Sequence, residues 1–171
     1  MKPFNVVNLV KWVEENKASL QPPVCNKEVF PDSEYIVMVV GGPNGRKDYH
    51  YNETPEFFYQ IKGDITLKVM VEGKPEDIVI REGEIFVLPS KVPHSPQRPA
   101  DSVGVVIEHR RNPELHTDGF HWYCESCNNL LHEEYFRLTD IEKQLPAAFK
   151  KFNENEALHK CNKCGDVLET K

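Results

Sequence analysis

The sequence has no apolar run approaching the roughly 20 residues that a membrane-spanning helix requires. It also has no excess of positive charge, because 21 lysine and arginine residues are outnumbered by 27 aspartate and glutamate residues. That balance argues against nonspecific nucleic-acid binding, which depends on many cationic side chains facing phosphates. We therefore expect neither a membrane nor a nucleic acid as a partner.

Cysteine is scarce, with five among 171 residues, and the first residues lack the pattern of a secretion signal. Residues 1–20 are amphipathic and include acidic side chains, whereas a signal peptide has an apolar core behind a basic start. We expect a cytoplasmic protein, in which thiols stay reduced. Four of the five cysteines form two C-x2-C pairs, and under reducing conditions such pairs indicate a metal site rather than disulfides.

Short segments rich in β-branched and aromatic residues dominate the middle of the chain, and turn signals such as GGPNG and EGKPED separate them. The segments expected to form strands are 35–40, 56–61, 65–71, 77–80, 84–88 and 102–108. Many short strands at close spacing favour a sandwich or a small barrel.

Helices are expected near both ends of the sequence. The first is predicted over 6–13, with Asn5 as its N-cap, and it must end before Pro22 and Pro23. The second is predicted over 138–152, where apolar residues recur at helical spacing. Those on its apolar side are Ile141, Leu145, Ala148, Phe149 and Phe152.

Two segments, 45–63 and 83–98, contain the most informative side chains. They hold two histidines and a glutamate, at His50, Glu56 and His94. Two imidazoles and one carboxylate can bind one face of a metal ion and leave the other face open. This donor set is typical of non-haem Fe(II) enzymes that use oxygen.

Two arginines lie in phase with these candidate ligands. Residues two apart on an extended segment point the same way, so Arg46 shares a face with His50, and Arg98 with His94. We expect the two guanidinium groups to converge on an anion beside the metal. Asp48 is also in phase, and it either pairs with Arg46 or is a surface carboxylate.

The two C-x2-C pairs consist of Cys124, Cys127, Cys161 and Cys164. Four thiolates without a spare position describe a closed tetrahedral site for Zn or a single Fe. Asn128 and Gly165 follow the two pairs, and both residue types tolerate the left-handed backbone that such a turn requires. Four unliganded thiols are the weaker alternative. Cys25 is unpaired, and we expect it to be buried.

The segments 45–63 and 83–98 resemble the two cupin signature motifs, G-x5-H-x-H-x3-E-x6-G and G-x5-P-x-G-x2-H-x3-N. Gly45 lies one residue closer to the first histidine than in the pattern, and Lys91 replaces a turn glycine. Asn52 stands in place of the second histidine, and Arg98 in place of the final asparagine. The changes at Asn52 and Arg98 are shared with the 3-hydroxyanthranilate 3,4-dioxygenase family. The strings GGPNGRKDYH, PEFFYQIKGD, LPSKVPHSPQRP, VIEHRR and WYCESC resemble that family as well.

The resemblance implies a mainly β fold, a cupin (jelly-roll) barrel with an N-terminal helix over residues 1–120. Residues 121–171 would form a small helical extension with a rubredoxin-like four-cysteine site. The implied activity is ring opening of 3-hydroxyanthranilate by O2, with catalytic Fe(II). The product, 2-amino-3-carboxymuconate semialdehyde, is the precursor of quinolinate in NAD biosynthesis through the kynurenine pathway. The family also suggests a homodimer.

The resemblance further assigns roles to individual residues. The Fe(II) ligands would be His50, Glu56 and His94. The substrate carboxylate would be held by Arg46 and Arg98, and Glu108 would face the substrate hydroxyl. Asn26 would add a further substrate contact. The histidines without ligand-like spacing are expected to be structural or at the surface; they are His109, His116, His121, His132 and His159.

Two other functions stay open on the sequence alone. Arg46 and Arg98 suit a phosphate as well as a carboxylate, so the chain could be another cupin enzyme with a small anionic substrate, such as a sugar-phosphate isomerase. Alternatively it could be a noncatalytic ligand-sensing cupin whose four-cysteine unit contacts DNA or a protein. The acidic residues around the cysteine pairs argue against DNA.

Overall fold

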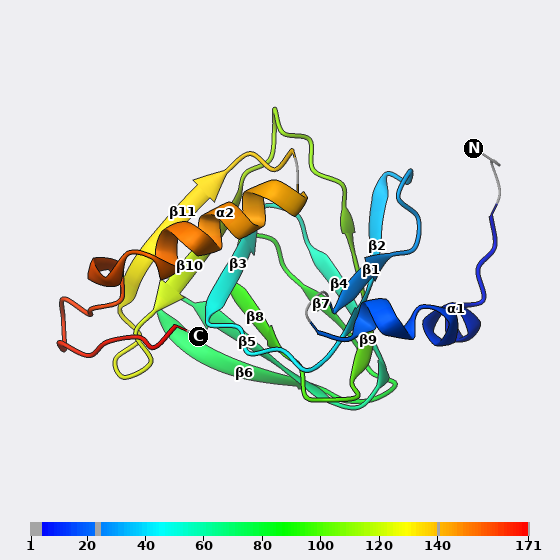
Figure 1. Cartoon of the computed structure of the whole chain (residues 1–171), viewed down its shortest axis with the longest axis horizontal. Coiled ribbons are helices and arrows are strands. Elements are labelled where there is room, and N and C mark those ends of the chain that lie inside the picture. Colours follow the sequence, from blue (N-terminus) through cyan, green and yellow to red (C-terminus); the bar gives the residue numbers. More distant parts are fainter. Residues whose placement is uncertain (1–4, 23–24, 140, 171) are drawn as a thin grey trace.

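Two antiparallel sheets face each other in the computed structural model, which describes residues 5–22, 25–139 and 141–170 (Figure 1). The five-stranded sheet runs, in spatial order, β1 (Asn26–Glu28), β2 (Tyr35–Gly41), β9 (Val103–His109), β4 (Glu56–Lys62) and β7 (Ile85–Leu88). The six-stranded sheet runs β11 (Leu130–Phe136), β10 (Asp118–Tyr123), β3 (Asp48–Asn52), β8 (His94–Gln97), β5 (Ile65–Val71) and β6 (Lys74–Ile80). The expected mainly β, jelly-roll cupin architecture is confirmed.

The main core lies between the two sheets and follows from the alternation of apolar residues along the strands. On β5 the side chains of Ile65, Leu67 and Val69 are buried, while Thr66 and Lys68 are only half-buried. The buried side chains pack with apolar residues from β4, β6 and β7, namely Phe58, Ile80 and Leu88. Each fully buried aliphatic side chain contributes about 1.5–3 kcal/mol, so this cluster stabilises the barrel that carries the site.

The first helix, α1 (Leu9–Glu15), begins later than the sequence suggested. The predicted span 6–13 with Asn5 as its cap is wrong at its start. Asn8 caps the helix, because its side chain accepts a hydrogen bond from the backbone N–H of Lys11 at 3.0 Å. Val6 consequently lies outside the helix and is 97% exposed. A short 3-10 helix, η1 (Lys17–Leu20), follows.

Residues 121–171 were expected to form a small helical extension, but the chain first adds two strands to the barrel, β10 and β11. β10 pairs with β3 on one side and with β11 on the other. The expected boundary after residue 120 therefore falls inside β10, and the division of the chain into two parts stays a prediction. The alternation that marks these strands is interrupted by charged residues in LLHEEYF, which concealed the second one.

The second helix, α2 (Ile141–Asn153), lies over β10 and β11 (Figure 1). Its buried Ala148 and Phe152 pack with Phe120 and Trp122 of β10, and the rings of Trp122 and Phe152 stack with centroids 4.3 Å apart. The predicted apolar side of this helix is confirmed for Leu145, Ala148, Phe149 and Phe152, whereas the Ile141 side chain is outside the described part of the chain. A short 3-10 helix, η2 (Glu156–Leu158), leads to the last cysteine pair.

None of the helices in the described residues is both long and apolar enough to cross a membrane.

Candidate active site

Three side chains predicted to bind a metal come together from three strands. His50 lies on β3, Glu56 begins β4, and His94 begins β8. One ligand atom from each lies within 4.8 Å of the others. Glu56 contacts both rings, with Oε1 at 3.5 Å from Nδ1 of His50 and Oε2 at 3.2 Å from Nε2 of His94. This donor set fits a metal ion that keeps coordination positions open for other ligands.

The two strands reach this geometry because the chain bends between them. β3 ends at Asn52 and β4 starts at Glu56, so the bend lies in the three residues between them, the last of which is Pro55. The Asn52 side chain fixes the turn, since its Oδ1 accepts hydrogen bonds from the backbone N–H and the hydroxyl of Thr54, at 2.6 and 2.9 Å.

Both imidazoles are oriented by further contacts. The Nδ1 of His94 is 3.0 Å from the carbonyl oxygen of Val92, which leaves Nε2 directed at Glu56. The Nε2 of His50 is 3.8 Å from Oδ1 of the buried Asp118. Burial lowers the pKa of His50, but its contacts with Asp118 and Glu56 outweigh that effect and raise the pKa to about 9.

Arg98 is a buried cation without a carboxylate partner among the described residues. Its side chain is enclosed, being 3% exposed, and its Nη1 donates only a long hydrogen bond of 3.4 Å to Oε1 of Gln60. Burial and the charge of Arg46 lower the pKa of Arg98 to about 10. A β-carbon at Gly104 would lie 2.5 Å from Oε1 of Gln60 and 3.0 Å from Nη1 of Arg98, so only glycine leaves room for both groups.

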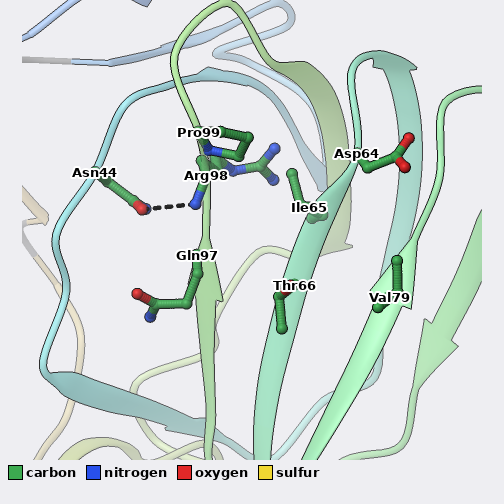
Figure 2. A pocket seen from close by; sticks show the side chains of 8 residues that line it. All are labelled: Asn44, Asp64, Ile65, Thr66, Val79, Gln97, Arg98 and Pro99. Carbon is green, nitrogen blue, oxygen red and sulfur yellow. Dashed lines mark hydrogen bonds between the residues drawn. The ribbon is translucent and has the colours of Figure 1, made fainter.

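The backbone at Arg98 is held by the side chain of Asn44. Its N–H donates to Oδ1 of Asn44 at 2.8 Å (Figure 2). The Nδ2 of Asn44 in turn donates to the carbonyl of Pro96 at 2.9 Å. These contacts lie beside a cavity of about 340 Å³ between the ends of β5, β6 and β8. The neighbouring Gln97 lines the same cavity but belongs to the opposite face of β8 from His94.

Arg46 pairs with Asp48, which settles the alternatives left open for that carboxylate. Its Nε donates to both carboxylate oxygens of Asp48, at 3.2 and 3.3 Å, and its Nη2 also contacts Asp48. Burial works to lower the pKa of Arg46, but Asp48 raises it above the usual value. The guanidinium of Arg46 remains partly accessible and lines a cavity of about 510 Å³ that Trp122 and Phe149 also line.

Glu108 and Glu56 are joined by Asn52, the residue that replaces the second cupin histidine. The Nδ2 of Asn52 donates to Oε1 of Glu56 at 2.6 Å and lies 3.3 Å from Oε2 of Glu108. Glu56 and Glu108 are also register partners on β4 and β9. Burial, reinforced by the negative charge of Glu56, raises the pKa of Glu108 to about 7. A carboxyl group with such a pKa suits proton transfer near neutral pH.

Two residues of this region were not found from the sequence. Arg111 forms ion pairs with Glu108 through Nη2, at 2.8 Å, and with Asp118 through Nε, at 2.8 and 2.9 Å. Asp118 is fully enclosed, and the Glu108 side chain is half-buried. Asp118 was overlooked because it opens a strand that was not predicted, and Arg111 because it follows two other basic residues in the string EHRR.

Asn26 lies on β1, at the edge of the five-stranded sheet, opposite Val40 of β2. Its contact with substrate stays a prediction. Cys25, expected to be buried, is only half-buried, and its thiol lies 3.6 Å from the carbonyl oxygen of Pro43.

The four cysteines of the C-x2-C pairs form a second cluster, with all four sulfur atoms within 4.8 Å of one another. The closest sulfur pairs are Cys124 with Cys164 at 3.5 Å and Cys127 with Cys161 at 3.6 Å. Backbone N–H groups, first that of Cys164, lower the pKa of the Cys161 thiol to about 6, which favours a thiolate. This donor set fits one tetrahedral metal ion.

The backbone after each cysteine pair adopts the predicted left-handed conformation. Asn128 has φ of 59° and Gly165 has φ of 84°. The N–H groups of these two residues bond to the carbonyls of Cys124 and Cys161, at 2.9 Å in each case. Each pair therefore forms the same compact turn around its sulfur atoms.

Similarity to known proteins extends over nearly the whole chain. The sequence is 52% identical over 161 residues, 94% of this chain and 90% of the relative, to a 3-hydroxyanthranilate 3,4-dioxygenase from Xanthomonas euvesicatoria pv. vesicatoria. It is 51% identical over 163 residues, 95% of this chain and 89% of the relative, to the protein of the same name from Neurospora crassa. A solved cupin-2 domain containing protein from Shewanella frigidimarina aligns with 17% identity and a TM-score of 0.48, over 62% of this chain and 95% of that one.

The profile of the 3-hydroxyanthranilic acid dioxygenase family matches residues 1–153, a span that includes all three barrel ligands and the first cysteine pair. The chain therefore belongs to the 3-hydroxyanthranilic acid dioxygenase family.

Proposed function

We propose that this chain opens the aromatic ring of 3-hydroxyanthranilate with dioxygen to give 2-amino-3-carboxymuconate semialdehyde. That product closes to quinolinate, which places the enzyme in NAD biosynthesis. Family membership supports the activity, and the buried Arg98 carries the case from the structure itself. An enclosed guanidinium without a negative partner is costly unless a ligand supplies the charge, and the substrate has one carboxylate.

Two arginines would hold that carboxylate. The hydrogen bond from Nη1 of Arg98 to Oε1 of Gln60 is long, at 3.4 Å. The other N–H groups of this guanidinium can therefore form the forked hydrogen bonds that a planar carboxylate accepts. Arg46 is already aligned by Asp48 and remains accessible from the 510 Å³ cavity. With its carboxylate on the two arginines, the substrate would direct its amine and hydroxyl toward the three barrel ligands, and Asn26 would add a further contact.

Glu108 would act as the catalytic base. The substrate hydroxyl must lose its proton to become a good metal ligand, and the O–H bond breaks as an O–H bond to the Glu108 carboxylate forms. The pKa of Glu108, about 7, lets it accept the proton at neutral pH and release it later. Asn52 holds this carboxylate beside Glu56.

We propose Fe(II) as the metal bound by His50, Glu56 and His94. Iron would supply the redox centre through which dioxygen reacts with the electron-rich ring. These three residues would hold the ion and leave room for the substrate and dioxygen to meet beside it, which would make their encounter effectively intramolecular.

The four-cysteine cluster would hold Zn or a single Fe in a structural role. The cluster links the turn after β10 to the segment after α2, because Cys124 and Cys127 follow β10 whereas Cys161 and Cys164 follow η2. Such a link would fix α2 against the barrel. We further propose a cytoplasmic homodimer, and a cupin part over 1–120 with a metal-binding extension over 121–171.

The activity is tested by loading the protein with Fe(II) without oxygen, adding 3-hydroxyanthranilate and then air. Oxygen uptake matched by near-ultraviolet absorbance of the ring-opened product is expected. Turnover of sugar phosphates without oxygen uptake would favour an isomerase on the same barrel. If neither reaction occurs and the protein shifts DNA in a gel at physiological salt, the result would favour a ligand-sensing protein.

A further inference from the structure

The carboxylate of Glu108 is held through one of its two oxygens. Oε2 lies 2.8 Å from Nη2 of Arg111 and 3.3 Å from Nδ2 of Asn52. Among the described residues, no hydrogen-bond donor contacts Oε1. One oxygen is therefore fixed, and the other is left available to a ligand.

Arg111 is itself fixed at every nitrogen. Its Nε donates to both oxygens of Asp118, its Nη1 donates to the carbonyl of His109 at 2.8 Å, and its Nη2 reaches Glu108. The Arg111 side chain is 4% exposed and that of Asp118 is fully enclosed. These contacts hold the guanidinium in one orientation, so it can impose its geometry on Glu108.

The contacts form a closed circuit around the candidate metal ligands. From His50 they pass to Asp118, then to Arg111 and Glu108, and return to Glu56 through Asn52. The residues on this path beyond the two ligands are Asp118, Arg111, Glu108 and Asn52. Arg111 is the only residue on the circuit that contacts two carboxylates as a permanent cation.

We infer that Arg111, supported by Asp118, is a positioning residue that fixes Glu108 so that Oε1 faces the substrate hydroxyl. This inference rests on the proposed function, in which Glu108 accepts the hydroxyl proton. Arg111 itself does not touch substrate. A lysine cannot replace it fully, since an ammonium group is a point charge and lacks the fork that spans two carboxylates.

The test compares Arg111→Met, Arg111→Lys and Glu108→Gln with the combined Arg111→Met/Glu108→Gln protein. Arg111→Met should lower kcat by about 100-fold, the cost of a misplaced reacting group, while KM changes less than about threefold because Arg46 and Arg98 are intact. The kcat of Arg111→Lys should lie between the values of Arg111→Met and the wild type. In the Glu108→Gln background, Arg111→Met should cause no further loss of kcat.

Arg110→Met is the matched control. Arg110 is the neighbouring arginine, but it pairs with Glu28 and donates to the carbonyls of Pro31 and Ser33, and none of these contacts belongs to the Glu108 circuit. Its kcat and KM should stay at the wild-type values. The Arg111→Met protein could misfold because the buried Asp118 carboxylate loses its partner. In that case the Arg111→Met/Asp118→Asn protein, which lacks this charge, takes the place of Arg111→Met in the comparison.

Crystal structures of the wild-type and Arg111→Met proteins provide a readout that needs no activity. The Glu108 carboxylate should leave its wild-type position in the variant. An unmoved carboxylate, an equal loss of kcat in the Glu108→Gln background, or a loss confined to KM would overturn the inference. Absence of wild-type turnover would instead overturn the proposed function, and the position of Glu108 in the crystals would still decide the role of Arg111.

Discussion

His50 and His94 are direct cross-strand partners on β3 and β8, with ring centroids 5.4 Å apart. Side chains of opposed residues in an antiparallel pair lie on the same face of the sheet, with β-carbons about 4.5–5.5 Å apart. The register of these two strands therefore sets the spacing between the two imidazole ligands. Glu56 completes the set from the facing sheet.

Removing either histidine should remove the barrel metal. We expect His94→Ala to abolish turnover and to lower the metal content by one ion per chain, because one carboxylate and one imidazole bind a divalent ion far more weakly than three ligands. Metal analysis and oxygen uptake measure both effects. His109→Gln, at the exposed end of β9, is the control. Near-normal turnover and metal content in His94→Ala would refute the ligand assignment.

Replacing Arg98 with Gln should weaken substrate binding more than it slows turnover. A hydrogen bond to a charged group contributes about 1.5–3 kcal/mol, so KM should rise about 10- to 100-fold. The control is 2-aminophenol, which has the amine and hydroxyl but lacks the carboxylate. Wild type and variant should differ little with this analogue. An equal effect on both substrates would show that Arg98 does not bind the carboxylate.

Loss of the four-cysteine metal should unfold the C-terminal segment under conditions in which the barrel stays folded. In Cys161→Ser/Cys164→Ser, we expect limited proteolysis to cut within residues 141–170 at protease levels that leave the wild type intact. The barrel metal should be retained. Cys25→Ser, which removes the unpaired thiol, should resemble the wild type. Unchanged protease resistance despite loss of the metal would contradict a structural role.

His121 should make the protein less stable in mild acid. Its ring nitrogens contact the hydroxyls of Tyr123 and Tyr135 at 3.0 and 2.8 Å, Tyr51 stacks on it, and Glu133 lies 3.8 Å away. Burial lowers the pKa of His121, so below about pH 6.5 the unfolded chain binds a proton that the folded chain does not.

The unfolding free energy should therefore fall as the pH drops below about 6.5, by at most about 1.4 kcal/mol per pH unit from this residue. Urea midpoints at pH 7.5 and 5.5 measure the effect. His121→Gln should show a smaller difference between the two midpoints than wild type. Equal differences would mean that His121 does not contribute to the acid sensitivity.

The sequence allowed the candidate metal ligands, and Arg46 and Arg98 beside them, to be named because they share a short-range pattern. Alternation along a strand placed His94 and Arg98 in phase, and the cysteine spacing was informative by itself. The contacts of Glu108 could not be anticipated in the same way. Arg111 meets Asp118 only because β10 lies beside β3, and that strand order depends on long-range pairing that no local pattern encodes.

The start of α1 shows a different kind of limit. Asn5 and Asn8 are both suitable caps, and the apolar residues Val6 and Val7 fit a helix as well as an extended segment. The structure uses Asn8 because Leu9, Trp12 and Val13 then face the outer side of the five-stranded sheet. Packing against a partner surface, rather than helix propensity, decided the boundary.

The pairing of β10 with β3 has a consequence for any shortened form of this protein. Without the chain beyond β9, β3 would become a border strand, and the backbone groups beside His50 would lose five register partners. Exposed strand borders recruit other chains, so a barrel trimmed in this way should aggregate rather than persist as a smaller enzyme.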